Sequence, residues 1–161
     1  MKKHQVDLTV NGRKVSMQVE ARQTLADALR GELGLTGTHL GCEHGVCGAC
    51  TLIVNGDPVR GCLMFAVQAQ DTEVVTVEGV SPKVGLNEIQ AALREFHGLQ
   101  CGFCTPGMVM MLHHLFSENG QPSEAEIREA ISGQLCRCTG YQGIVNAAKA
   151  VAARHQTRTS N

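Results

Sequence analysis

The loop that decides the fold of this chain reads Gly41-Cys42-Glu43-His44-Gly45-Val46-Cys47-Gly48-Ala49-Cys50. Its three cysteines are separated by four and then by two residues, and a fourth, Cys62, follows after eleven more. Three thiolates from one loop can converge on one point only if the backbone turns back sharply, and Gly41, Gly45 and Gly48 give it that freedom. The pattern therefore predicts a site at which four thiolates surround a metal centre.

The spacing of this set, C-x4-C-x2-C followed by a distant cysteine, is that of plant-type [2Fe–2S] ligands. The alternative is a structural zinc site, which uses C-x2-C but usually as two short knuckles. Three cysteines within one glycine-rich loop favour the iron–sulfur cluster. His44 lies inside the loop and could suggest a Rieske-type centre. Because four cysteines already complete the ligand set, we interpret His44 as a solvated loop residue.

The remaining four cysteines form a second set, which consists of Cys101, Cys104, Cys136 and Cys138. It contains a C-x2-C pair and a C-x-C pair that lie 31 residues apart. Each pair precedes a segment of helical pattern, and the partial positive charge of a helix N-terminus favours thiolates and an anionic cluster. This spacing by itself fits either zinc or an iron–sulfur cluster. Beside the first set, two [2Fe–2S] clusters account for all eight cysteines, so we predict two.

Composition narrows the class of protein. The 161 residues suffice for one ordinary domain or two small ones, and small domains commonly gain stability from metal sites. A net charge of −1, with one Tyr, four Phe and no Trp, gives no indication of nucleic-acid or membrane-surface binding. We find neither an apolar run of membrane-spanning length nor a secretory signal, and expect a cytoplasmic protein. In a reducing compartment, eight cysteines indicate metal ligation rather than disulfides.

Hydrophobic periodicity predicts a small α+β unit in the first half of the chain. Asn11-Gly12 separates two alternating runs and is the pair that type I′ hairpin turns prefer. Thr24 can cap a helix, and Gly34 suits its end. The elements expected here are a hairpin over residues 6–19, a helix over 25–33, a strand over 51–54, a turn over 55–58 and a strand over 74–77.

The second half of the chain has helical periodicity throughout. Four helices are expected, over residues 88–97, 108–116, 123–131 and 144–152. Ser123 and Glu126 form a capping box for the third, and we expect the chain to fray after Arg154. Because Ser81-Pro82 interrupts both patterns, we predict one domain over residues 1–80 and a helical one over 81–161.

The chain lacks the motifs of substrate chemistry. We find no glycine-rich dinucleotide fingerprint, no P-loop and no nucleophile–base pairing that would leave the cysteines free for two clusters. Met108, Met110 and Met111 fit core packing at helical spacing better than metal ligation, and we assign no histidine to metal. The pattern therefore indicates a protein that moves single electrons between cofactors held by partners.

Three segments together resemble the small iron–sulfur subunit of molybdenum hydroxylases, the xanthine oxidase family that also contains carbon monoxide and aldehyde dehydrogenases. They are residues 41–50, Gln100-Cys101-Gly102-Phe103-Cys104-Thr105-Pro106-Gly107-Met108 and Cys136-Arg137-Cys138-Thr139-Gly140-Tyr141. The resemblance implies an α+β fold, in which a plant-ferredoxin-like β-grasp precedes a four-helix-bundle [2Fe–2S] domain. It also implies a large molybdopterin subunit and a medium FAD subunit as partners, assembled as a dimer of heterotrimers.

The same resemblance implies a direction of electron transfer, from molybdenum to the helical-domain cluster, then to the ferredoxin-like cluster and to FAD. It places Gln100 and Cys138 beside the pterin. Residues 61–69 resemble carbon monoxide dehydrogenase small subunits in particular, but the substrate pocket of these enzymes lies in another chain. The substrate therefore stays open.

Several alternatives are also open at this point. The chain could be a free ferredoxin-like carrier, although a second cluster domain is more than a mobile shuttle needs, or a zinc-stabilised adaptor. Phe103 either lies at an apolar partner interface around the second set or packs in the helical core. Gln100 either meets the pterin, or caps a helix or faces solvent.

Overall fold

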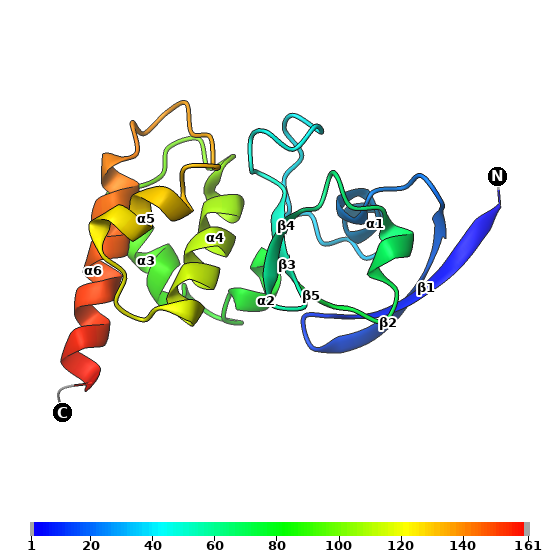
Figure 1. Cartoon of the computed structure of the whole chain (residues 1–161), viewed down its shortest axis with the longest axis horizontal. Helices are drawn as coiled ribbons and strands as arrows, with labels where there is room; N and C mark the ends of the chain where they lie inside the picture. Colours follow the sequence, from blue (N-terminus) through cyan, green and yellow to red (C-terminus); the bar gives the residue numbers. More distant parts are fainter. Residues whose placement is uncertain (1, 160–161) are drawn as a thin grey trace.

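The computed structural model describes residues 2–159 of the chain, and the side chains up to residue 157. A β-sheet unit and a helical unit lie side by side along the long axis, with the N-terminus at one end and the C-terminal helix at the other (Figure 1). The predicted α+β class, a ferredoxin-like unit followed by a helical unit, is confirmed. No helix within the described residues is long and apolar enough to cross a membrane.

The sheet has five strands: β1 (Lys3–Val10), β2 (Arg13–Glu20), β3 (Thr51–Val54), β4 (Asp57–Arg60) and β5 (Glu73–Val75). Their order is β2-β1-β5-β3-β4, with β1 and β5 parallel and all other neighbours antiparallel. Helix α1 (Leu25–Gly31) and the short 3-10 helix η1 (Ala66–Ala69) pack on the apolar core of this sheet. Burying one face of the sheet under α1 gives the unit its own core.

Local signals in the sheet unit are largely confirmed. Asn11 and Gly12 both have positive φ, at 51° and 75°, as a type I′ turn requires. Thr24 caps α1 through a hydrogen bond from the Asp27 N–H. The turn expected over residues 55–58 is shorter, because Asp57 already begins β4, and Pro58 is tolerated there since β4 is an edge strand.

The strand expected to reach residue 77 ends at Val75. The next residue, Thr76, is buried and exchanges hydrogen bonds with the Asn11 side chain at 2.9 and 3.0 Å. Helix α2 (Val77–Val80) follows, and Val77 and Val80 pack on the core of the helical unit. The domain division at residues 80 and 81 stays a prediction.

The helical unit contains α3 (Glu88–Glu95), α4 (Thr105–Glu118), α5 (Glu124–Ala130) and α6 (Gln142–Thr159). They surround a second apolar core. The capping box at Ser123 is confirmed, since its hydroxyl accepts the Glu126 N–H and the Glu126 carboxylate accepts the Ser123 N–H. The expected fraying after Arg154 is wrong as far as Thr159, because α6 continues to that residue and the His155 ring lies 2.7 Å from the Glu88 carboxylate; residues 160–161 lie outside the described part of the chain.

Candidate iron–sulfur sites

The first set of cysteines lies where the loop after α1 meets the β3–β4 hairpin. Cys50 directly precedes β3 and Cys62 follows β4, so antiparallel pairing brings these two residues to the same end of the hairpin. Both thiols are buried, whereas Cys42 and Cys47 in the loop are partly exposed. The hairpin thus supplies the inner thiols and the glycine-rich loop supplies the outer ones.

The loop stabilises negative charge at the Cys42 thiol. Hydrogen bonds from the N–H groups of His44 and then of Cys47 lower the pKa of the Cys42 thiol to about 6, the second of them at 3.3 Å from the sulfur. Burial, in contrast, raises the pKa of Cys50 to about 11. The fold-back that aims these N–H groups uses the left-handed conformation of Gly45, with φ of 87°.

The second set comes from two loops of the helical unit. Cys101 lies in the loop before α4 and Cys104 is the N-cap residue of that helix, while Cys136 and Cys138 lie between α5 and α6. The sulfurs of Cys101 and Cys138 are 3.5 Å apart and both residues are exposed. Cys104 and Cys136 are only partly exposed. This site therefore presents one thiol pair to the surface.

In the second set the pKa shifts do not follow exposure: the pKa is lowered for the exposed Cys101 and the partly exposed Cys136, and raised for the partly exposed Cys104 and the exposed Cys138. The Phe103 N–H lowers the pKa of Cys101, whereas burial raises the pKa of Cys104 to about 12. The Cys136 sulfur lies 3.1 Å from the Thr139 hydroxyl. Cys104 also sits at the N-terminus of the 14-residue helix α4, whose partial positive charge favours a thiolate.

In both sets the thiols meet as pairs. The pairs are Cys42 with Cys47, Cys50 with Cys62, Cys101 with Cys138, and Cys104 with Cys136. Within residues 2–159, no three His, Cys, Asp or Glu side chains are arranged to hold a metal ion. Two pairs of thiols per set are the donor set of a [2Fe–2S] cluster, in which four thiolates are shared between two irons. The residues present thus fit the cofactor, and the ligand assignment itself stays a prediction.

Gln100 and Cys138, which the resemblance places at the pterin, are neighbours. The Gln100 amide N–H donates to the Cys138 carbonyl at 3.1 Å, and both residues are exposed. Gln100 caps no helix of the described residues, because α3 begins after Asn87 and α4 after Cys104. Its second N–H and its carbonyl oxygen are left for a further partner. Contact with a pterin remains a prediction.

The two cysteine loops also contact each other, which the sequence did not indicate. The Leu135 N–H donates to the Cys47 carbonyl at 2.8 Å. A Cβ atom on Gly107, in the first turn of α4, would overlap the Gly48 carbonyl oxygen, so the two backbones touch without side chains between them. Glycines at both positions were a signal of close approach, but not of the partner.

The Tyr141 side chain hydrogen-bonds the backbone of the loop that carries Cys136. Its hydroxyl accepts the Cys136 N–H at 2.8 Å and donates to the Gln134 carbonyl at 3.0 Å. The hydroxyl thereby satisfies two backbone groups of the loop that carries a predicted ligand. Sequence reasoning treated Tyr141 only as part of a motif.

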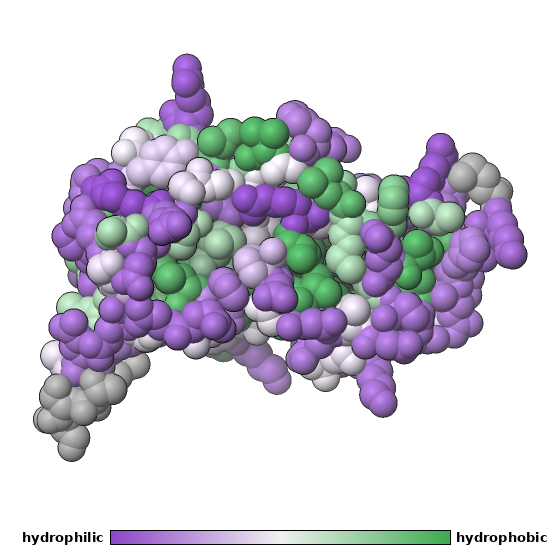
Figure 2. Space-filling model, in the orientation of Figure 1, coloured by the Kyte–Doolittle hydropathy of each residue, from purple (hydrophilic) through white to green (hydrophobic). Residues whose placement is uncertain are grey.

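Phe103 does not pack in the helical core. Its side chain is 47% exposed and its ring lies 5.1 Å from the ring of His39, in the loop of the first set. Other exposed apolar residues near the cysteines are Val46, Leu63 and Leu135. Figure 2 shows apolar surface on the upper side of the molecule, over the top of α4 and the neighbouring loop. The interface interpretation of Phe103 stays a prediction.

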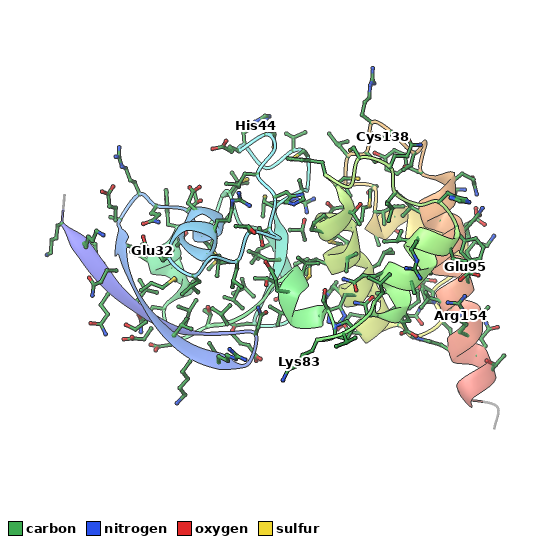
Figure 3. All side chains as sticks on the ribbon, turned by 180° about the vertical axis from the view of Figure 1, so that it is seen from behind. Glu32, His44, Lys83, Glu95, Cys138 and Arg154 are labelled. Atoms are coloured by element: carbon green, nitrogen blue, oxygen red, sulfur yellow. The ribbon has the colours of Figure 1, made fainter. Side chains whose placement is uncertain are left out.

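Both sets open toward one side of the molecule. Figure 3 shows His44, in the loop of the first set, and Cys138 at the same edge. His44 is exposed and its Nδ1 bonds the Cys42 carbonyl, so its ring is engaged with the loop backbone. A partner on this side would meet the outer thiols of both sets.

Two family models match successive parts of the chain. Residues 8–78 match the family model of a 2Fe-2S iron-sulfur cluster binding domain, and residues 76–149 match that of a [2Fe-2S] binding domain. The chain is 54% identical to the caffeine dehydrogenase subunit gamma of Pseudomonas sp. (strain CBB1), over 94% of this chain and 92% of that one. It is 50% identical to the nicotine 6-hydroxylase small subunit of Paenarthrobacter nicotinovorans, covering 89% and 86%.

Solved structures agree with the sequence relatives. A chain of quinoline 2-oxidoreductase from Pseudomonas putida 86 superposes with a TM-score of 0.92 at 47% identity, covering 98% of both chains. The aldehyde oxidoreductase of Desulfovibrio gigas superposes with a TM-score of 0.90 at 37% identity, over 96% of this chain and 17% of that longer one. With both domain models matched in order and close relatives over nearly its whole length, the chain belongs to the family of small [2Fe–2S] electron-transfer subunits of molybdenum hydroxylases.

Proposed function

We propose that this chain takes electrons from a molybdopterin-containing large subunit and delivers them to an FAD-containing medium subunit. The two sets of four cysteines would hold two [2Fe–2S] clusters, which supply one-electron carrier chemistry. The observation that carries the proposal is the hydrogen bond from the Leu135 N–H to the Cys47 carbonyl at 2.8 Å. Leu135 is bonded to Cys136, so one hydrogen bond and a few covalent bonds join a ligand of one site to a ligand of the other.

The second site faces the molybdopterin subunit in this proposal. Cys101 and Cys138 are its exposed thiols, and Gln100 lies against the Cys138 backbone with an amide N–H and an oxygen to spare. Such an amide can bond the donor and acceptor groups of a pterin edge. Because electron tunnelling weakens steeply with distance, a cofactor that touches a ligand residue is well placed to exchange electrons.

The first site faces the FAD subunit. Val46 and Leu63 are each 58% exposed beside its outer thiols, and Phe65 is 45% exposed. Apolar side chains gathered around a redox site suit a permanent subunit contact. This feature also favours a bound subunit over the alternative of a free ferredoxin-like carrier, which must leave its partners. We place the assembly, a dimer of heterotrimers, in the cytoplasm.

The substrate is bound elsewhere in such an assembly. The relatives are named for caffeine, nicotine and quinoline, all of them nitrogen heterocycles, whereas another is an aldehyde oxidoreductase. The residues of this chain face cofactors and partner subunits, so they do not select among these substrates. Identifying the large subunit that co-purifies with this chain would identify the substrate.

The proposal is tested by Gln100→Leu in the assembled enzyme. We expect slower reduction of the second site by substrate, followed by stopped-flow spectroscopy, and unchanged transfer from FAD to the final acceptor. Gln18→Leu, an exposed glutamine on β2, serves as the matched control. An unaltered reduction rate, with the chemical step shown to be faster, would remove the pterin role of Gln100. Zinc in place of iron in the purified wild-type chain would remove the electron-transfer function itself.

A further inference from the structure

Gln134 is a buried polar side chain at the junction of the two units. It lies in the loop between α5 and α6 and is only 1% exposed. A buried amide is costly unless its N–H groups and its oxygen are bonded. With the amide oriented to satisfy both ends, its nitrogen donates to the Gly48 carbonyl at 2.8 Å. Its oxygen accepts from Arg60 Nη1 at 2.9 Å and from the Thr51 hydroxyl at 3.0 Å.

All three partners of the Gln134 side chain belong to the other unit. Gly48 follows the predicted ligand Cys47, Thr51 begins β3, and Arg60 ends β4, two residues before the predicted ligand Cys62. Gln134 itself precedes the predicted ligand Cys136 by two residues. The amide therefore ties the backbone beside one cysteine set to the backbone beside the other.

Arg60 completes the connection. Its second guanidinium nitrogen, Nη2, donates to the Gly133 carbonyl at 2.8 Å, while Nη1 contacts the Thr51 hydroxyl. The planar guanidinium can bond several acceptors in fixed directions at once. One side chain from each unit thus bonds the other unit, and together they bridge the sheet and the loop that carries the second set.

The backbone at Gly48 leaves room for the Gln134 amide. Gly48 has a positive φ of 78°, and a Cβ atom there would overlap the Gln134 side-chain amide and lie 2.7 Å from the Gly133 carbonyl oxygen. Any other residue at position 48 would push the two loops apart. Close approach and a buried polar connection occur at the same point, between the two sites.

We propose that Gln134, together with Arg60, is a positioning residue that sets the separation of the two clusters and hence their electronic coupling. The proposal rests on the proposed function, because it requires both sites to hold clusters. An apolar side chain at position 134 would remove one of the hydrogen bonds to the Gly48 carbonyl, which keeps those from Thr51, and one acceptor of the partly exposed Arg60 guanidinium. With the hydrogen bonds of the amide lost and water able to replace them, the two loops would move apart.

The test uses the magnetic interaction between the two clusters in the reduced holoprotein. Each reduced [2Fe–2S] cluster is paramagnetic, and the splitting of its EPR lines by the other decreases steeply with their separation. For Gln134→Leu we expect reduced or lost splitting, with the iron content and both individual signals retained. A merely structural role would lower the melting temperature without changing the splitting.

Arg60→Met is the second variant, which tests the proposal if the Gln134→Leu protein does not bind both clusters. Arg60 is partly exposed, so its loss is easier to tolerate, and the same decrease in splitting is expected. Gln18→Leu is the control and should leave the spectrum unchanged. If Gln134→Leu or Arg60→Met binds both clusters and shows the wild-type splitting, the proposal that Gln134 and Arg60 set the cluster separation is overturned. A wild-type chain that binds zinc, or one cluster only, instead overturns the proposed function.

Discussion

Replacing Gly107 by alanine tests how closely the two units must approach. Gly107 lies in the first turn of α4, and the added methyl group would overlap the Gly48 carbonyl oxygen and lie 3.2 Å from the Ala49 Cα and carbonyl oxygen. The obstructing atoms are backbone, so no side chain can rotate away to make room. Either the helix or the loop of the first set must move.

The magnitude follows from two opposing effects. Overpacking costs about 1–3 kcal/mol, and a clash with backbone belongs at the upper end of that range. Alanine gains up to about 1 kcal/mol over glycine in helix propensity. The net destabilisation is then about 2 kcal/mol, and at about 2–4 °C per kcal/mol for a chain of this size the melting temperature should fall by about 4–8 °C.

The assay is thermal melting of the holoprotein by circular dichroism at a fixed scan rate, with iron content measured in parallel. Gly31→Ala is the matched control, because Gly31 is also helical and a Cβ atom there meets nothing within 4 Å. It should melt at the wild-type temperature or slightly above. A Gly107→Ala protein that melts as hot as wild type would refute the inference that the backbones are in contact.

Three further predictions concern single side chains. Cys42→Ser and Cys101→Ser should each lower the iron content from about four to about two per chain, with one EPR signal lost in each; loss of both signals in either variant would contradict independent sites. Burial lowers the pKa of His113 on α4, so the unfolded state binds the proton more tightly than the folded state does. His113 should therefore destabilise the fold at a pH below its folded-state pKa. This destabilisation should disappear as the pH rises through the ordinary pKa of histidine. His113→Leu should flatten the rise in urea midpoint between about pH 5.5 and 7.5; parallel wild-type and His113→Leu profiles would contradict this. Tyr141→Phe removes the hydroxyl that bonds two backbone groups beside the second set, at an expected cost of about 1–3 kcal/mol, and should shift the potential of the second cluster alone in a redox titration; an equal shift of both would contradict a local role.

Much of the fold could be predicted because its signals are local. The turn at Asn11-Gly12, the cap at Thr24 and the capping box at Ser123 each depend on residues within three positions of one another, and all three are present. Errors arose where a distant contact decided the outcome. The last strand ends before Thr76 because that residue bonds Asn11, 65 positions away, and α6 is extended past Arg154 with His155 bonded to the distant α3.

The candidate sites divide in the same way. The sequence alone determined which residues carry the thiols and on which elements they lie, because ligand spacing and hydrophobic periodicity are properties of short segments. It also grouped the cysteines into two sets of four, which the structure keeps in separate units. The shifted thiol pKa values required the tertiary structure, since backbone N–H groups aimed at the sulfurs lower those of Cys42 and Cys101, and burial raises those of Cys50 and Cys104.

The junction between the units was decided by tertiary structure alone. Gln134 contacts Thr51 across 83 positions, and the Leu135 N–H meets the Cys47 carbonyl across a similar span. A buried glutamine in a loop, or a glycine in the first turn of a helix, has no periodic pattern that names its partner. The sequence thus predicted two four-thiolate sites, whereas their joining by a backbone hydrogen bond and a buried amide follows only from how the sheet packs against α4 and the two cysteine loops.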